Sequence, residues 1–182
     1  KENDINQFTN FINEYDFNLA RNLILKQIKK GKVKIISNIN FNENNPKNIK
    51  YIINGYVKDA EIKLLNQSKI ENVKFNFFVD QDFVKLNKIE LAFDKIFVTS
   101  EKVNIKKINN YFNISGNFKT NKTKINLKNY TKLINTNLDL IDDRPINLSS
   151  DNELSFKINK KLNIKDLSII SKLNFDELFT NS

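Results

Sequence analysis

Residues 73–91, VKFNFFVDQDFVKLNKIEL, decide the fold expected for this chain. In the first half of this stretch polar residues alternate with large apolar ones, and only Phe78 breaks the pattern. Successive side chains of a strand point to opposite faces, so four apolar side chains share one face: Val73, Phe75, Phe77 and Val79. The stretch therefore predicts a strand with one apolar and one polar side.

The second half of the stretch contains a spacing that recurs near the other end of the chain. Its form is apolar-x-apolar-x-x-apolar-x-apolar, with two residues instead of one between the middle pair. The two copies are Val84, Leu86, Ile89 and Leu91, and Leu162, Ile164, Leu167 and Ile169. We interpret the two-residue gap as a β-bulge that keeps the same face inward. The recurrence suggests a repeated sheet unit.

Weaker alternation of the same kind runs through much of residues 32–182, which we assign to repeated antiparallel β units. About ten short strands with tight polar connections favour antiparallel pairing over a βαβ fold. The predicted class is mostly β, with one apolar sheet face that something must cover. A second sheet, closure into a barrel, or an open trough holding an apolar ligand would each cover it.

Residues 1–31 differ, because their apolar residues recur every three or four positions, which predicts an amphipathic helical segment. Asp4 is the expected cap, and Gly31 after Lys29-Lys30 is the expected stop. The apolar stripe consists of Phe8, Phe11, Ile12, Tyr15, Leu19, Leu23 and Ile24.

Composition bounds the chain without identifying a partner. Asn, Ile and Lys dominate, while Arg occurs only at positions 21 and 144, which is typical of a low-GC genome. The formal charge of +9 therefore partly reflects codon supply. A first residue other than Met, and no Met elsewhere, make a segment of a longer protein the expectation. No apolar run reaches the length of a membrane span.

The sequence offers little catalytic chemistry. It has no His and no Cys, and its three glycines do not form a phosphate-binding loop. Two carboxylate pairs remain, Asp80 with Asp82 and Asp142 with Asp143, and aspartates at turns are common for structural reasons. We therefore expect no enzyme activity, no metal site and no cofactor.

The aromatic residues admit two interpretations. Phenylalanines beside lysines can stack on the bases of a single-stranded nucleic acid. Here they alternate on one face with Val, Leu and Ile, which favours burial and disfavours a nucleic-acid partner. A basic nucleic-acid-binding domain therefore stays a second alternative.

Four stretches resemble the repeat domain of AsmA-like and TamB-like bridge-type lipid-transport proteins of Gram-negative bacteria. FINEYDFNLARNLILKQIKKGKVKIISNINF (11–41) is similar to its entry, where a helix runs into a glycine and a strand, with Arg21, Leu23, Ile28 and Gly31 matching that outline. IENVKFNFFVDQDFVKLNKIELAFDKIFVTSEKVNI (70–105) resembles its strand unit. YFNISGNF (111–118) resembles the closing strand, and ELSFKINKKLNIKDLSI (153–169) the start of another unit.

This resemblance implies an elongated, curved antiparallel sheet with a taco-like apolar groove that carries phospholipid acyl chains across the periplasm between the inner and outer membranes. The implied protein is anchored to the inner membrane by a segment outside this chain. The structural alternative is a closed β-sandwich acting as an adhesive or scaffolding module. The residues expected to line the groove are Phe75, Phe77, Val79, Val84, Leu86, Ile89, Leu91, Phe112, Ile114 and Phe118.

Overall fold

The computed structural model describes residues 3–4, 28–40, 50–63, 69–80, 83–93, 96–126, 145–159 and 163–176. Within these ranges every regular element is a β-strand, and no helix is present. The strands are β1 (Asn3–Asp4), β2 (Ile28–Asn40), β3 (Lys50–Lys63), β4 (Lys69–Val79), β5 (Phe83–Phe93), β6 (Ile96–Ile108), β7 (Tyr111–Ile125), β8 (Ile146–Asn159) and β9 (Ile164–Phe175).

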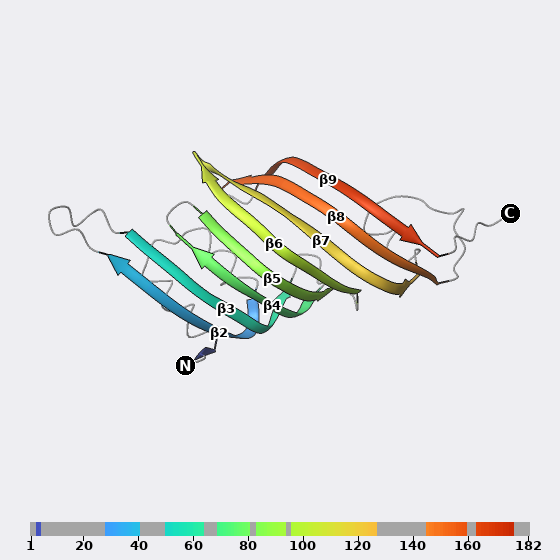
Figure 1. Ribbon diagram of the computed structural model, residues 1–182, viewed down its shortest axis with the longest axis horizontal. Helices are drawn as coiled ribbons and strands as arrows, with labels where there is room; N and C mark the ends of the chain where they lie inside the picture. Colours follow the sequence, from blue (N-terminus) through green and yellow to red (C-terminus); the bar gives the residue numbers. More distant parts are fainter. Residues whose placement is uncertain are drawn as a thin grey trace.

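All nine strands form one open sheet in which spatial order follows sequence order, from β1 to β9. Every neighbouring pair is antiparallel, so the chain advances across the sheet by successive hairpins. The ribbons cross the molecule as one curved and twisted layer (Figure 1). The sequence therefore predicted the class and the antiparallel pairing correctly, and the described strands form a single sheet.

The pairing register places nearly all the alternating apolar residues on one side of the sheet, which we call the apolar face. Gly55 pairs with Phe77, Phe77 with Leu86, and Leu86 with Val103, and residues paired directly across an antiparallel ladder lie on the same face. The intervening residues form the polar face, where Asn54, Phe78 and Lys85 are paired in the same way.

Two-residue gaps in the apolar alternation are bulges, as the sequence predicted for β5 and β9. Lys88 and Asp166, each the second residue of its gap, have positive φ angles of 51°. The pairing register slips at both places, since one strand has an extra residue there. The same device recurs at Asp59 in β3 and Asn72 in β4, with φ angles of 50° and 54°.

Several of the best-buried side chains flank these gaps. Val57 and Ala60 lie on either side of the β3 gap, at 5% and 1% exposure, and Val73 pairs with Ala60. Ile89 follows the β5 gap and pairs with Ser100, and both are buried. A bulge bends its strand and increases its twist, so the gaps curve the sheet around its own most buried residues.

Turns at one end of the strands are held by their own side chains. The Asp80 carboxylate accepts a 2.7 Å hydrogen bond from the Phe83 amide, and the Asp80 amide donates to the Phe83 carbonyl. Asn159 holds the β8–β9 connection similarly, because its side-chain oxygen accepts from the Asn163 amide at 3.0 Å. Asp80 therefore has the structural role that aspartates commonly take at turns.

The predicted N-terminal helix is wrong wherever the structure describes that segment. Asp4 is not a helix cap, because it lies in β1 and pairs with Lys32 of β2. Residues 28–31 open β2, where Lys30 pairs with Glu61, and Gly31 has a φ of 146°, an extended conformation that essentially only glycine adopts. Pairing with β3 therefore replaces the helix end there, and residues 5–27 lie outside the described residues.

Strand bounds also differ from the prediction of about ten short strands. Residues 93–98 contain the end of β5 at Phe93 and the start of β6 at Ile96. Val103 and Ile105 belong to the same β6, since the break in alternation before them is a bulge. The described strands are therefore fewer and longer than the alternation alone suggested.

Candidate functional site

All ten residues predicted to line a groove lie on the apolar face. They come from three strands: Phe75, Phe77 and Val79 from β4, Val84, Leu86, Ile89 and Leu91 from β5, and Phe112, Ile114 and Phe118 from β7. β6 lies between β5 and β7 and adds Val98, Val103 and Ile105 to the same face. The sheet thus brings all ten together as one continuous surface.

Phe77 has a close partner in Gly55. A Cβ at position 55 would lie 2.4 Å from the Phe77 ring and 2.1 Å from the Lys34 carbonyl oxygen, so the ring and the backbone fill that space. The Phe75 ring stands 6.4 Å from the Phe77 ring, tilted by 59°. Both rings pack against the buried cluster of Val33, Val57, Ala60 and Val73. Glycine at position 55 is therefore required for the ring to lie flat on the sheet.

Most of the ten residues are only half-buried, and Ile89 is the exception at 6% exposure. At the β9 edge the apolar face is more open, because all twelve β9 residues are exposed. Its apolar row consists of Ile164, Leu167, Ile169, Leu173 and Phe175, each 41–59% exposed. The first three belong to the repeated spacing found in the sequence, but no residue of this row is among the ten predicted groove residues.

A hydrogen-bonded polar cluster interrupts the apolar face between β7 and β8. The Thr120 and Ser150 hydroxyl oxygens are 2.7 Å apart, and the Asn152 amide donates to Ser150 at 2.8 Å and to the Phe118 carbonyl at 3.2 Å. This cluster was not predicted from the sequence. Its signal is the run of polar residues at 149–153, where the alternation of β8 lapses.

Several cross-strand ion pairs lie on the polar face. Lys74 pairs with Glu90 and Lys119 with Asp151, each at 3.4 Å and each directly opposite its partner. In two further ion pairs the pKa values of both partners are shifted. The hydrogen bond from Lys30 lowers the pKa of Glu61 and raises that of Lys30, and Lys157 and Asp166 affect each other's pKa in the same way.

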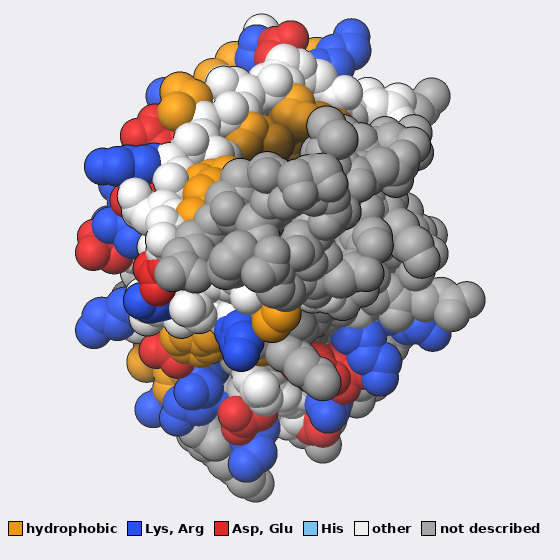
Figure 2. All heavy atoms as spheres, turned by 90° about the vertical axis from the view of Figure 1, so that its right-hand side faces the viewer, with side chains coloured by type: hydrophobic (Ala, Val, Ile, Leu, Met, Phe, Trp, Pro, Cys, Tyr) orange, Lys and Arg blue, Asp and Glu red, His pale blue; other side chains and the backbone are white. Residues whose placement is uncertain are grey.

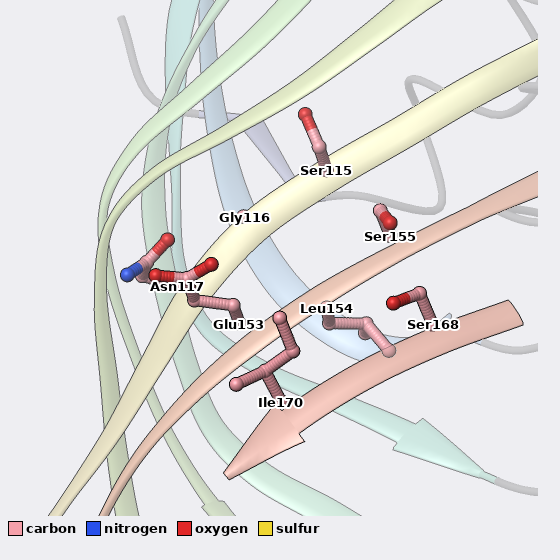
Figure 3. Close-up of a pocket in the computed structure, with 8 residues that line it drawn as sticks. All are labelled: Ser115, Gly116, Asn117, Glu153, Leu154, Ser155, Ser168 and Ile170. Atoms are coloured by element: carbon pink, nitrogen blue, oxygen red, sulfur yellow. The ribbon is translucent and has the colours of Figure 1, made fainter. Parts of the chain in front are cut away.

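An open depression lies between β7, β8 and β9 (Figure 3). Three serines paired across these strands, Ser115, Ser155 and Ser168, line it with Asn117, Glu153 and Ile170. These six side chains belong to the polar face, so the depression is separate from the ten candidates. The depression was not predicted from the sequence, because strand order is needed to bring the serines together.

No metal centre or catalytic cluster emerges from the described residues. Within them no group of three or more acidic side chains is arranged to hold a metal ion. Of the predicted carboxylate pairs, only Asp80 is described, and its carboxylate serves the turn; Asp82, Asp142 and Asp143 lie outside the described residues. The described part of the chain also contains no helix long and apolar enough to span a membrane.

Comparison with known proteins adds no identity. No protein-family model, no curated protein and no solved structure matches this chain. The site is therefore interpreted from its own geometry: a broad, one-sided apolar surface on a single curved sheet.

Proposed function

We propose that this chain is a segment of an AsmA-like protein, anchored to the inner membrane and extending through the periplasm, that conducts phospholipids between the inner and outer membranes. In this proposal the apolar face is the floor of a taco-like groove, and acyl chains move across the strands from one edge of the sheet towards the other. The function needs no catalytic residue, no cofactor and no metal.

The observation that carries the proposal is the gathering of all ten candidate residues on one face of one sheet. Neighbouring strands lie roughly 4.8 Å apart, so β2 to β9 span roughly 35 Å, more than the roughly 15 Å that one bilayer leaflet supplies to a lipid tail. A tail leaving a bilayer loses about 0.8 kcal/mol for each methylene exposed to water. A half-buried apolar floor offers contacts that offset this loss.

Adjacent residues on opposite faces provide a test with a matched control. Ile169 and Ile170 are both isoleucines of β9, 59% and 63% exposed, and Ile169 lies on the apolar face. Ile169→Asp should lower the phospholipid that co-purifies with the chain at least about tenfold, because a charge within an apolar layer costs about 2.5–3.5 kcal/mol. Ile170→Asp should leave the bound lipid unchanged.

Native mass spectrometry of the purified chain measures the bound lipid, and circular dichroism checks that each variant is folded. Phe77→Asp extends the test to the middle of the face, with Phe78→Asp on the polar face as its control. A folded chain that carries no phospholipid, or equal losses for Ile169→Asp and Ile170→Asp, would contradict lipid conduction and favour the structural-module alternative.

A further inference from the structure

Charge is distributed unevenly along the strands. The gaps of the central strands divide the described sheet, without residues 28–29 of β2, into two halves, which we define by residues. The basic half comprises 33–40, 50–57, 75–80, 83–88, 102–116, 154–159 and 163–169. The neutral half comprises 3–4, 30–32, 58–63, 69–74, 89–93, 96–101, 117–126, 145–153 and 170–176. Each half contains one end of every long strand.

Lysines are shared evenly between the halves, but acidic residues are not. The basic half has nine lysines and two aspartates, Asp80 and Asp166, a formal charge of +7. The neutral half has ten lysines and nine acidic residues, a formal charge of +1. Codon supply explains abundant lysine in both halves, but it does not explain why the acidic residues avoid one of them.

Ion pairing follows the same division. Lys30, Lys69, Lys74, Lys119 and Lys122 of the neutral half all pair with acidic side chains of that half. In the basic half one ion pair joins described residues, between Lys157 and Asp166 at 2.7 Å. The remaining positive charge there has no described acidic partner, so it is available to an external anion.

Exposed aliphatic side chains accompany these lysines on the polar face. Ile36, Ile52 and Ile108 are 57%, 42% and 42% exposed there. We define the basic patch as these isoleucines with the polar-face lysines of the same half that form no ion pair with a described residue: Lys34, Lys50, Lys85, Lys88, Lys102, Lys106 and Lys165. Figure 2, which views the molecule from the side on which β7 and β9 end in the neutral half, shows positive and negative side chains mixed along its left and lower outline.

We propose that the basic patch docks the sheet onto the surface of an anionic phospholipid bilayer. Lysines attract the headgroup phosphates, and each lysine near an anionic surface strengthens binding about fivefold. Exposed aliphatic side chains enter the headgroup boundary, as on amphipathic membrane-surface helices. A nucleic acid suits the patch less well, because base stacking needs exposed aromatic rings, whereas Phe78 and Phe83 on this surface are half-buried.

Docking and lipid conduction use opposite faces, so each can fail without the other. The docking assay is flotation of the complete chain with phosphatidylcholine vesicles, with and without phosphatidylglycerol as the anionic lipid. Binding should require phosphatidylglycerol and weaken as salt rises. Phe77→Asp, which should abolish lipid carriage, should leave docking unchanged.

Paired substitutions test whether the patch itself is responsible. Lys85→Gln with Lys106→Gln should weaken binding about 25-fold. Lys63→Gln with Lys124→Gln removes the same charge from the neutral half and should weaken binding less than about twofold, because salt screens charges beyond roughly 10 Å. Ile108→Ser should weaken binding several-fold, whereas Phe97→Ser, equally exposed in the neutral half, should not.

Three results would overturn the proposal. Equal losses for the two lysine pairs would make the net charge of the whole chain responsible. Equal binding to vesicles without phosphatidylglycerol would remove the electrostatic basis. Tighter binding to single-stranded oligothymidine than to anionic vesicles, lost in the Lys85→Gln and Lys106→Gln chain, would make the patch a nucleic-acid surface.

Discussion

β5 and β9 have the same spacing of apolar residues, but they differ in how deeply these side chains are buried. In both strands the second residue of the gap has a φ of 51°, and the apolar residues on either side of the gap face the same way. Yet Ile89 of β5 is 6% exposed, whereas Leu167, its counterpart in β9, is 57% exposed. The spacing therefore determines the local backbone and the facing of side chains, while neighbouring strands determine burial.

The largest expected effect comes from truncating the two counterparts. Ile89→Ala should lower the free energy of unfolding by about 2–5 kcal/mol, because it leaves a cavity among packed side chains. Leu167→Ala should change it by less than about 0.5 kcal/mol, since its side chain is largely in water. Urea denaturation at constant m-value measures both, and similar losses at the two positions would show that β9 is covered in solution.

Glycine substitutions, with a smaller expected effect on stability, test whether β5 and β9 have the same backbone conformation at the gap. Lys88 adopts a left-handed conformation that disfavours a side chain, so Lys88→Gly should stabilise the chain by roughly 0.5–1 kcal/mol. Asn87→Gly, one residue earlier, should destabilise it by about 0.5–1 kcal/mol, because glycine weakens an ordinary strand position. The corresponding β9 pair, Asp166→Gly and Lys165→Gly, should differ in the same direction. Thermal unfolding of the four variants gives the signs, and a reversed order at either site would contradict a shared bulge.

The smallest effect is expected from pH. Lys30 lowers the pKa of Glu61, and Lys157 lowers that of Asp166, so these carboxylates stabilise the fold above their unfolded pKa values. That contribution should disappear as pH falls below about 4 through the lowered values. The raised pKa values of Lys30 and Lys157 add stability that should be lost above about pH 10.4. The midpoints of urea denaturation across pH, compared between the native chain, Glu61→Gln and Asp166→Asn, measure this pH dependence. If both variants show the same pH dependence as the native chain, these carboxylates do not contribute to it.

How much the sequence could predict depends on how local each feature is. Alternation placed all ten candidate residues on one face, and the gap before Ile89 identified a bulge, because both are properties of a single strand. Strand order was not predictable, since many orders place Phe77 and Phe112 on the same face. The Thr120, Ser150 and Asn152 cluster was missed because it exists only after β7 and β8 are paired.

The described ends of the predicted N-terminal helix, Asp4 and residues 28–31, failed for a different reason. Apolar spacing of three and four is compatible with a helix, but the segment ends at Ile28–Gly31, where pairing with β3 is available. Lys30 gains an ion pair with Glu61 there, and Gly31 lies where a Cβ would be 2.9 Å from that of Ala60. Tertiary pairing therefore overrode the local preference, and no feature within those residues announced it.

The order of the strands also has a consequence for assembly and evolution. Each strand makes its extensive contacts with its neighbours in sequence. The stability of the sheet is therefore approximately a sum of contributions from successive hairpins. Contacts that are local in sequence favour rapid folding. Because all its residues are exposed, β9 is the strand expected to separate from the sheet first. Because the described strands form an open sheet and not a closed barrel, a hairpin gained or lost at that edge would lengthen or shorten the sheet without disturbing the other strands.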